Sequence, residues 1–394
     1  MAGEQVAVKY EAHSSQSVGV QFTAFISNSK NLCVLRHGYN TIHNKNAFRM
    51  NHAKSKSILR YKADLRTLGF VGLYLGLTAT GFVAYPNLGW GLIIPWIMVC
   101  CFLCFICAVI VHNTIHCPIF RKKSWNKAFQ FVLSISYGYS VSAFVPGHNF
   151  SHHKETQTNK DSMRTTKARF RWNLLNQALF SFLVTRDILV QENRWVKKMY
   201  REKRTWFNQW LAETLLVNAV KITILFIDWQ AALLFVWLPH FYSVWGIVGS
   251  NVWQHDGTDK NHPYNHSRTF RSKLLNFFTM NNGYHGAHHE KPGLHWSLLP
   301  AYHTKHIEPY IHPNLNRISL VKFLWEMNVY PGKRVDYLGK PIAVPEPSED
   351  EDWIADVRVG SKSNRKDFGA EEIDEENILN TTDSRETRAK PAKA

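Results

Sequence analysis

Histidine is the residue type in this chain that could do chemistry, because many of its twenty copies fall in short clusters. The clusters are His112-Asn113-Thr114-Ile115-His116, His148-Asn149-Phe150-Ser151-His152-His153 and His285-Gly286-Ala287-His288-His289. Residues four apart in a helix share a face, so His112 and His116 can direct two ring nitrogens to one point, as can His148 and His152. The doublets His152-His153 and His288-His289 offer neighbouring directions. This pattern predicts a site with more than one metal ion.

A further histidine, His255, lies four residues after Asn251 and therefore on the same helical face. Nine imidazoles exceed the four ligands of a tetrahedral zinc site and would supply two metals with four or five ligands each. Imidazole suits Fe, Zn, Cu and Ni, so the ligand type alone does not identify the metal. The candidate ligands are His112, His116, His148, His152, His153, His255, His285, His288 and His289.

The elements that must position these ligands are apolar and long. No charged residue occurs from Leu68 to Val111, which is enough for two passes of about 20 residues each. The turn signal Tyr85–Gly89 divides this run into helices at about 67–84 and 90–111. A second pair is expected at 210–227 and 230–252, turning at Asp228-Trp229. We predict an all-α integral membrane protein with four transmembrane helices in two hairpins.

Charge asymmetry predicts the orientation of these hairpins. Residues 1–66 hold ten Lys/Arg against three acids, and Arg121, Lys122 and Lys123 follow the first hairpin. The positive-inside rule then places both termini and all the histidine clusters on the cytosolic side, within a helical cap that holds a di-metal site. The serine-containing apolar stretch 128–145 is expected to be interfacial or re-entrant, since a full span would separate the clusters.

Polar residues in or near the spans are candidates for other roles. Lys221 is expected to reach the far membrane interface with its ammonium group. His240 follows Pro239 and either marks a kink or contributes to function. His295 and Trp296 follow the third cluster, which makes them candidates for contacts to the substrate or to the metal ligands.

The remaining segments and charges constrain domains and partners. Residues 1–60 are expected to be a poorly ordered basic segment, 61–340 the membrane domain, and 345–394 a disordered acidic tail.

The net charge of +17 raises nucleic acid as a partner, but the basic residues flank apolar spans, which excludes nucleic acid. Residues 121–210 hold 17 Lys/Arg and 5 Asp/Glu. This positive charge is either a binding platform for anionic headgroups, an acyl carrier or an acidic redox partner, or the ordinary charge of a cytosolic segment. The six cysteines lack zinc-site spacing and indicate a reducing environment.

The three clusters resemble the histidine boxes of the membrane fatty acid desaturase and hydroxylase superfamily, over about residues 65–310. Asn251-x-x-x-His255 is similar to the additional motif of stearoyl-CoA desaturases, in which the histidine is a ligand and the asparagine holds a metal-bound water. Gly147–Lys154, followed by Thr156 and Asp161, also resembles alkane hydroxylases, whereas Asn281–His285 resembles lipid desaturases. The first box is one residue shorter than the acyl-CoA desaturase form.

The resemblance implies two iron ions, O2 as co-substrate, and a desaturase that introduces a double bond into an acyl lipid, a carrier-bound acyl chain or a free fatty acid. A hydroxylase or an oxidative fatty-acid decarboxylase is the alternative. No flavin, dinucleotide or fused cytochrome b5 signature is found, so a separate donor is expected, either cytochrome b5 or a ferredoxin with its reductase. The endoplasmic reticulum is the expected membrane. A metal transporter or receptor is disfavoured, because eight of the nine histidines are expected in cytosolic segments and not in mid-membrane.

Overall fold

The computed structural model describes residues 57–359, and within them nearly all of the regular secondary structure is helical. The α-helices are α1 (Asp64–Ala84), α2 (Trp90–His116), α3 (Lys123–Tyr137), α4 (Val141–Val145), α5 (His153–Glu155), α6 (Asn173–Glu202), α7 (Arg204–Ile227), α8 (Trp229–Ala232), α9 (Leu238–His255), α10 (Lys273–Phe278), α11 (His285–Glu290), α12 (Leu299–Tyr302) and α13 (Leu320–Asn328). Short 3₁₀ or π-helical segments are η1 (Tyr85–Asn87), η2 (Pro146–His152), η3 (Thr165–Lys167), η4 (Leu233–Trp237), η5 (Trp296–Leu298), η6 (His303–Ile307) and η7 (Pro313–Leu315). The strands β1 (Thr269–Phe270) and β2 (Asn316–Arg317) form one parallel pair.

Four helical stretches are long and apolar enough to cross a membrane. They are Asp64–Asn87, Trp90–His116, Arg204–Ile227 and Trp229–His255. Each exceeds the roughly 20 residues that a bilayer requires. The turn between the first two falls at Tyr85–Asn87, as the sequence predicted. The all-α fold with four membrane-length helices is therefore confirmed, whereas the arrangement of the hairpins in the membrane stays a prediction.

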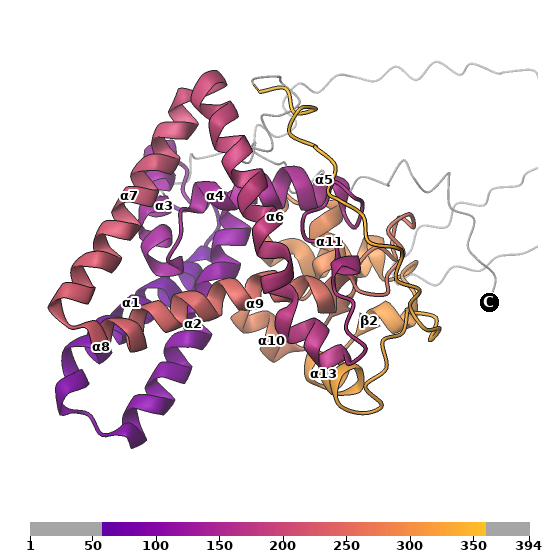
Figure 1. Cartoon of the computed structure of the whole chain (residues 1–394), viewed down its shortest axis with the longest axis horizontal. Helices are drawn as coiled ribbons and strands as arrows, with labels where there is room; N and C mark the ends of the chain where they lie inside the picture. Colours follow the sequence, from indigo (N-terminus) through magenta and orange to yellow (C-terminus); the bar gives the residue numbers. More distant parts are fainter. Residues whose placement is uncertain (1–56, 360–394) are drawn as a thin grey trace, which may run out of the picture. The chain divides into compact units, whose positions relative to one another are not determined.

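Helix α2 is the centre of the apolar core. It packs along both α1 and α9, and its cysteines Cys100, Cys104 and Cys107 are completely buried. In Figure 1, α7 and α9 diverge from α8, while α3 packs against both α2 and α7. All the cysteines of the described residues are free thiols, which agrees with small polarizable side chains that fill gaps between helices.

The stretch expected to be interfacial or re-entrant is a broken helix. Helix α3 and the helical stretch Val141–Glu155 meet at an angle of 86°, the geometry of a broken span or a re-entrant segment. Gly138 ends α3 with φ +85°, and a Cβ at this position would lie 2.3 Å from His240 Cγ. Only glycine fits this left-handed conformation and this close approach.

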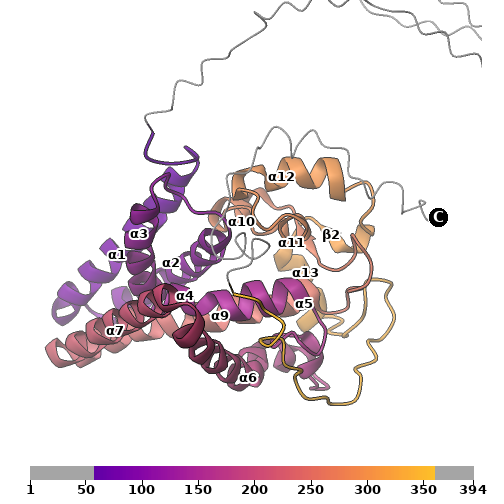
Figure 2. The ribbon, with the colours of Figure 1, turned by 90° about the horizontal axis from the view of Figure 1, so that it is seen from above.

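Two charged residues of α7 bind the two sides of this break. Lys221 Nζ donates to the Gly138 carbonyl at 2.8 Å, at the C-terminal end of α3. Glu213 accepts from the Ser142 amide at 2.9 Å and from the Ser140 hydroxyl at 2.8 Å, at the start of α4. A cation at a helix C-terminus and an anion at an N-terminus both complement the helix dipole. Figure 2 shows α4 alongside α7. The expectation that Lys221 reaches the far interface was wrong, because its ammonium group is buried on this carbonyl.

The packed chain extends farther toward the C-terminus than the composition predicted. Within 345–359, Trp353 is buried and donates to Gln191 of α6 at 2.8 Å, and Asp350 pairs with Lys167 at 2.8 Å. The apolar and acidic side chains of this segment therefore contact apolar and basic side chains in the rest of the described chain. Residues 1–56 and 360–394, which hold most of the two expected disordered segments, lie outside the described residues.

Candidate metal centre

The nine candidate ligands come from four helical segments. His112 and His116 end α2, and His255 ends α9. The second box lies on the π-helix η2 and the start of α5, and the third box opens α11. Seven of the nine side chains are buried, and His153 and His289 are half-buried. The sequence folds so that the ends of two membrane-length helices and two short helices meet.

The structure divides the nine histidines into two groups, and the nitrogens within each group lie within 4.8 Å of one another. The five-histidine group contains His112, His116, His148, His153 and His288. The four-histidine group contains His152, His255, His285 and His289. Each doublet contributes one residue to each group, as expected for a site with two metal ions.

The histidines of the second box are divided between the two groups differently from the prediction. An α-helical spacing predicted that His148 and His152 converge, but His148 is grouped with His153 and His152 belongs to the other group. The reason is that Pro146–His152 forms a π-helix, in which residues five apart share a face. This local widening directs three nearly consecutive histidines to two different points.

Ring nitrogens within each group lie at the separation of neighbouring ligands on one metal ion. His153 Nε2 is 3.0 Å from His148 Nε2 and 3.1 Å from His288 Nε2. In the other group, His255 Nε2 is 2.9 Å from His285 Nε2. With metal–nitrogen distances of about 2.0–2.1 Å, two nitrogens at a right angle around one ion lie roughly 2.9 Å apart. These positions fit metal coordination.

Several buried ring nitrogens support the same interpretation. Within residues 57–359, the Nε2 atoms of His116, His152 and His289 are buried and have no hydrogen-bond partner. Buried polar atoms in proteins are nearly always paired. Because these nitrogens belong to both groups, a metal ion in each group would supply the partners. The donor set fits the two metals that the sequence predicted.

The opposite nitrogen of three rings is fixed by an acceptor. His152 Nδ1 lies 3.1 Å from Asp161 Oδ2, and His255 Nδ1 lies 3.0 Å from the His266 carbonyl. His112 Nδ1 lies 3.1 Å from Asn113 Oδ1. Since these oxygens only accept, each ring carries its proton on Nδ1 and presents the Nε2 lone pair to its group.

Asp161 is an acid that contacts a candidate ligand. It is completely buried and also accepts from the amides of Gln157 and Met163, both at 2.9 Å. Burial raises the pKa of this carboxyl, but His152 and the two amides outweigh burial and hold the pKa below its ordinary value. Asp161 therefore supplies a fixed negative charge to the four-histidine group.

The third box is kept in its neutral, metal-binding form. Burial lowers the pKa of His285, His288 and His289 well below the ordinary histidine value, and repulsion from neighbouring imidazoles adds to this. The neutral ring is the form that binds a metal. These three rings can therefore accept a metal ion at neutral pH without first losing a proton.

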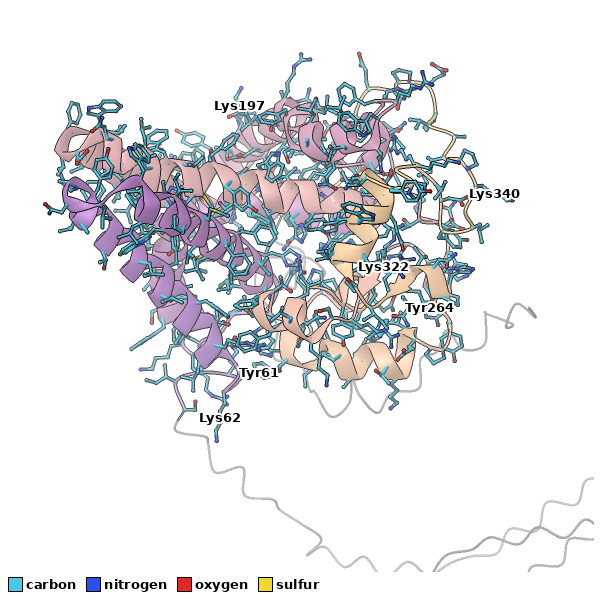
Figure 3. The ribbon with its side chains drawn as sticks, turned by 90° about the horizontal axis from the view of Figure 1, so that it is seen from below. Tyr61, Lys62, Lys197, Tyr264, Lys322 and Lys340 are labelled. Atoms are coloured by element: carbon cyan, nitrogen blue, oxygen red, sulfur yellow. The ribbon has the colours of Figure 1, made fainter. Side chains whose placement is uncertain are left out.

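His295 and Trp296 lie outside both groups and anchor the segment after the third box to α1. Asp64, completely buried, accepts from His295 Nε2 at 3.1 Å and from Trp296 Nε1 at 3.0 Å. The Ser297 amide donates to His295 Nδ1, and His295 donates to Asp64 through Nε2. Tyr61, which is labelled in Figure 3, stacks on the His295 ring with centroids 3.7 Å apart.

The other two candidates, Asn251 and His240, are not among the nine histidines of the two groups. Asn251 is buried one turn before His255, and its Nδ2 donates to Met163 Sδ at 3.4 Å. His240 lines a largely apolar cavity of about 270 Å³ with Tyr74 and Lys221. The role of Asn251 in holding a metal-bound water stays a prediction.

Sequence reasoning missed the supporting acids Asp161 and Asp64. Asp161 was noted only as part of the resemblance to alkane hydroxylases, and its place eight residues after the doublet was the available signal. Asp64 stood at the start of an apolar span, where an acid needs a buried partner, but its partners lie more than 230 residues away. Pattern alone cannot show such a contact.

This geometry defines a helical membrane protein with two histidine groups suited to two metal ions. The family model described as fatty acid desaturase matches residues 88–319, which include all nine candidate ligands. The chain therefore belongs to the fatty acid desaturase family. Membership implies an oxidoreductase that acts on fatty acids. A comparison with curated proteins found no match.

Proposed function

We propose that this protein is an O2-dependent di-iron desaturase that introduces a double bond into an acyl chain. The observation that carries the proposal is the division of nine histidines into groups of five and four within 4.8 Å. When bound, two iron ions would supply the redox chemistry that removes hydrogen from an unactivated methylene with O2, for which redox-inert zinc is unsuited. A hydroxylase or an oxidative decarboxylase on the same scaffold is the alternative.

The residues of the chain bind and orient. His112, His116, His148, His153 and His288 would hold one iron ion, and His152, His255, His285 and His289 the other. Asp161, Asn113 and the His266 carbonyl fix the rings so that Nε2 faces each ion. The buried setting keeps water away from the reacting carbon. Asn251 would orient a water at the metal one helical turn from His255.

The acyl substrate would approach from the membrane. His116 and His255 end two membrane-length helices, so the site lies where these helices leave their apolar stretch. With both termini and the site on the cytosolic side of the endoplasmic reticulum, a polar head would stay at the surface while the chain enters between the helices. An acyl lipid, a carrier-bound acyl chain and a free fatty acid all meet this requirement.

A separate electron donor, cytochrome b5 or a ferredoxin served by its reductase, would dock on α6. Part of the basic 121–210 region is already neutralised, because Lys160 pairs with Asp356 and Arg164 with Asp350. Helix α6 still exposes cations that have no ion pair within the described chain: Arg186, Arg194, Lys197 and Arg201. Lys197 lies at the periphery in Figure 3. An acidic donor would complement this face.

The reaction is tested by profiling lipids and hydrocarbons of cells that express the protein. Wild-type cells should gain acyl double bonds that cells with His152→Ala lack. His262→Ala is the matched control, because His262 lies outside both groups and accepts from the amides of Tyr264 and Asn265. New hydroxyl groups or shortened alkenes would favour the alternatives, and unchanged profiles would contradict all three.

Donor docking has its own test. With limiting acidic donor, turnover should fall as ionic strength rises, because salt screens attraction between exposed charges. Lys197→Gln should weaken the donor dependence, whereas the same change at exposed Lys340, in the segment after α13, should not. Turnover that is insensitive to salt would argue against docking on α6.

A further inference from the structure

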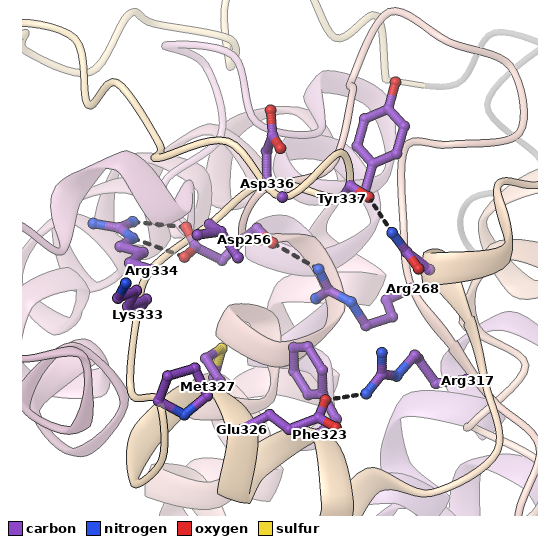
Figure 4. A pocket seen from close by; sticks show the side chains of 14 residues that line it. Asp256, Arg268, Arg317, Phe323, Glu326, Met327, Lys333, Arg334, Asp336 and Tyr337 are labelled. Carbon is purple, nitrogen blue, oxygen red and sulfur yellow. Dashed lines mark hydrogen bonds and ion pairs between the residues drawn. The ribbon is translucent and has the colours of Figure 1, made fainter.

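A second pocket is lined in part by Asp256, the residue that follows candidate ligand His255. It has a volume of about 430 Å³ and is lined by residues that follow α9, by residues of η7, β2 and α13, and by the segment after α13. Figure 4 shows Asp256, Arg268, Arg317, Phe323, Glu326, Lys333 and Arg334 around it. The lining contains four cations (Arg268, Arg317, Lys333, Arg334) and three carboxylates (Asp256, Glu326, Asp336), an excess of one positive charge.

Arg268 is the buried cation of this pocket. Its guanidinium donates to the carbonyls of Trp253 at 2.6 Å and Asp256 at 3.1 Å, which fixes its position. Within residues 57–359, Arg268 Nε is buried without a hydrogen-bond partner, and the guanidinium has no salt bridge to a carboxylate. The Asp256 carboxylate is instead bound by Arg334 at 2.6 and 2.8 Å. A buried cation without a paired anion is costly.

A second guanidinium lies close to the first. Arg268 and Arg317 both face the Phe323 ring, with their central carbons 4.3 and 5.7 Å from its centroid. Arg317 pairs with Glu326, and Lys333 is exposed with no ion pair of its ammonium group within the described chain. Two cations over one ring repel each other, and an anion between them would relieve this repulsion.

We propose that this pocket binds the phosphate group of a phosphate ester. Arginine forks match phosphate oxygens in pairs, and a lysine adds a point charge. Donors of Arg268, Arg317 and Lys333 reach the pocket from different elements, which suits an anion with more than two acceptor oxygens better than a carboxylate. Arg268 is held by the carbonyls of Trp253 and Asp256, on either side of candidate ligand His255 in the chain, so the pocket is connected through the end of α9 to one candidate ligand.

The ester has two sources, a soluble phosphate ester or a phospholipid headgroup, and the test separates them. The full chain is placed in phosphatidylcholine nanodiscs, and its thermal midpoint is measured with glycerol 3-phosphate or with phosphatidic acid in the disc. A ligand that binds the folded state raises the midpoint with concentration. A rise with glycerol 3-phosphate alone supports the proposal and identifies a soluble ester, and a rise with phosphatidic acid alone supports it and identifies a headgroup. A rise with both supports recognition of the phosphate group that the two ligands share. No rise beyond that given by acetate at equal ionic strength overturns it.

Matched variants locate the binding. Lys333→Gln should weaken affinity about tenfold, as expected for the loss of one charge-assisted hydrogen bond. Glu326→Gln should tighten binding because it releases Arg317, and a misfolded protein would not show tighter binding. Lys340→Gln, the same charge change outside the pocket lining, should leave affinity unchanged. Equal effects of the two lysine variants would overturn the assignment. Binding is measured without turnover, so the result is independent of the proposed desaturase activity.

Discussion

The two histidine groups are built alike but are held differently. Each takes histidines from the second and third boxes, and each adds the end of a membrane-length helix, α2 for one and α9 for the other. The four-histidine group has the carboxylate of Asp161 and a backbone carbonyl behind its rings. The five-histidine group has an amide oxygen, from Asn113. One group is therefore rich in ligands, and the other is supported by a fixed negative charge.

The two groups therefore represent two different ways of stabilising a metal ion. An additional neutral ligand adds a bond to the metal, whereas a carboxylate behind a ligand raises the basicity of that ligand and offsets the metal charge. The four-histidine group should depend strongly on its one anionic support. The five-histidine group should tolerate the loss of its amide partner.

Removal of a ligand should give the largest difference between the groups. We expect His255→Ala to release the metal of the four-histidine group, to leave the five-histidine group loaded and to abolish activity. His262→Ala should keep both metals and activity, because His262 belongs to neither group. Elemental analysis and product assays of the purified variants measure this. Full metal content and near-normal activity in His255→Ala would exclude His255 as a ligand.

Loss of the anionic support should have an intermediate effect. Asp161→Asn keeps the shape of the side chain but removes its charge, so affinity at the four-histidine group should fall about 10–100-fold. Asn113→Ala should reduce affinity at the five-histidine group by less. Competition with a chelator compares the two variants. Equal losses would show that the charge of Asp161 does not distinguish the groups.

Loosening the helix break should affect both groups alike, since the second box that follows it supplies ligands to each. Lys221→Met removes a buried charge-assisted hydrogen bond worth about 1.5–3 kcal/mol. Metal affinity should fall a few-fold at both groups, and Lys221→Arg should restore most of it. Metal titration monitored by absorption spectra reports each group. A change confined to one group would contradict this role of the break.

The smallest effect on metal content is expected at Asn251. Asn251→Ala should retain both metals, because the Asn251 amide donates a hydrogen bond to Met163 Sδ and both groups consist of histidines. Activity should still be lost if Asn251 orients a water at the metal. Metal content and turnover are measured on the same preparation. Loss of metal in this variant would make Asn251 part of the binding site itself.

Much of the fold and the histidines of the candidate site could be predicted from the sequence, because both depend on local patterns. Apolar length predicted the four membrane-length helices, and histidine spacing predicted the nine side chains that form the two groups. The grouping could not be predicted, because the π-helical geometry of Pro146–His152 is not visible in residue types. The burial of Lys221 and the contact of Asp64 with His295 depend on partners far away in the chain.

The metal content of the purified full-length chain tests the central claim most directly. After expression with supplemented iron, elemental mass spectrometry should find two iron ions per chain, one for each histidine group. His255→Ala prepared in the same way should retain one. Stoichiometric zinc without iron in the wild-type chain, even with iron supplied, would contradict the di-iron centre.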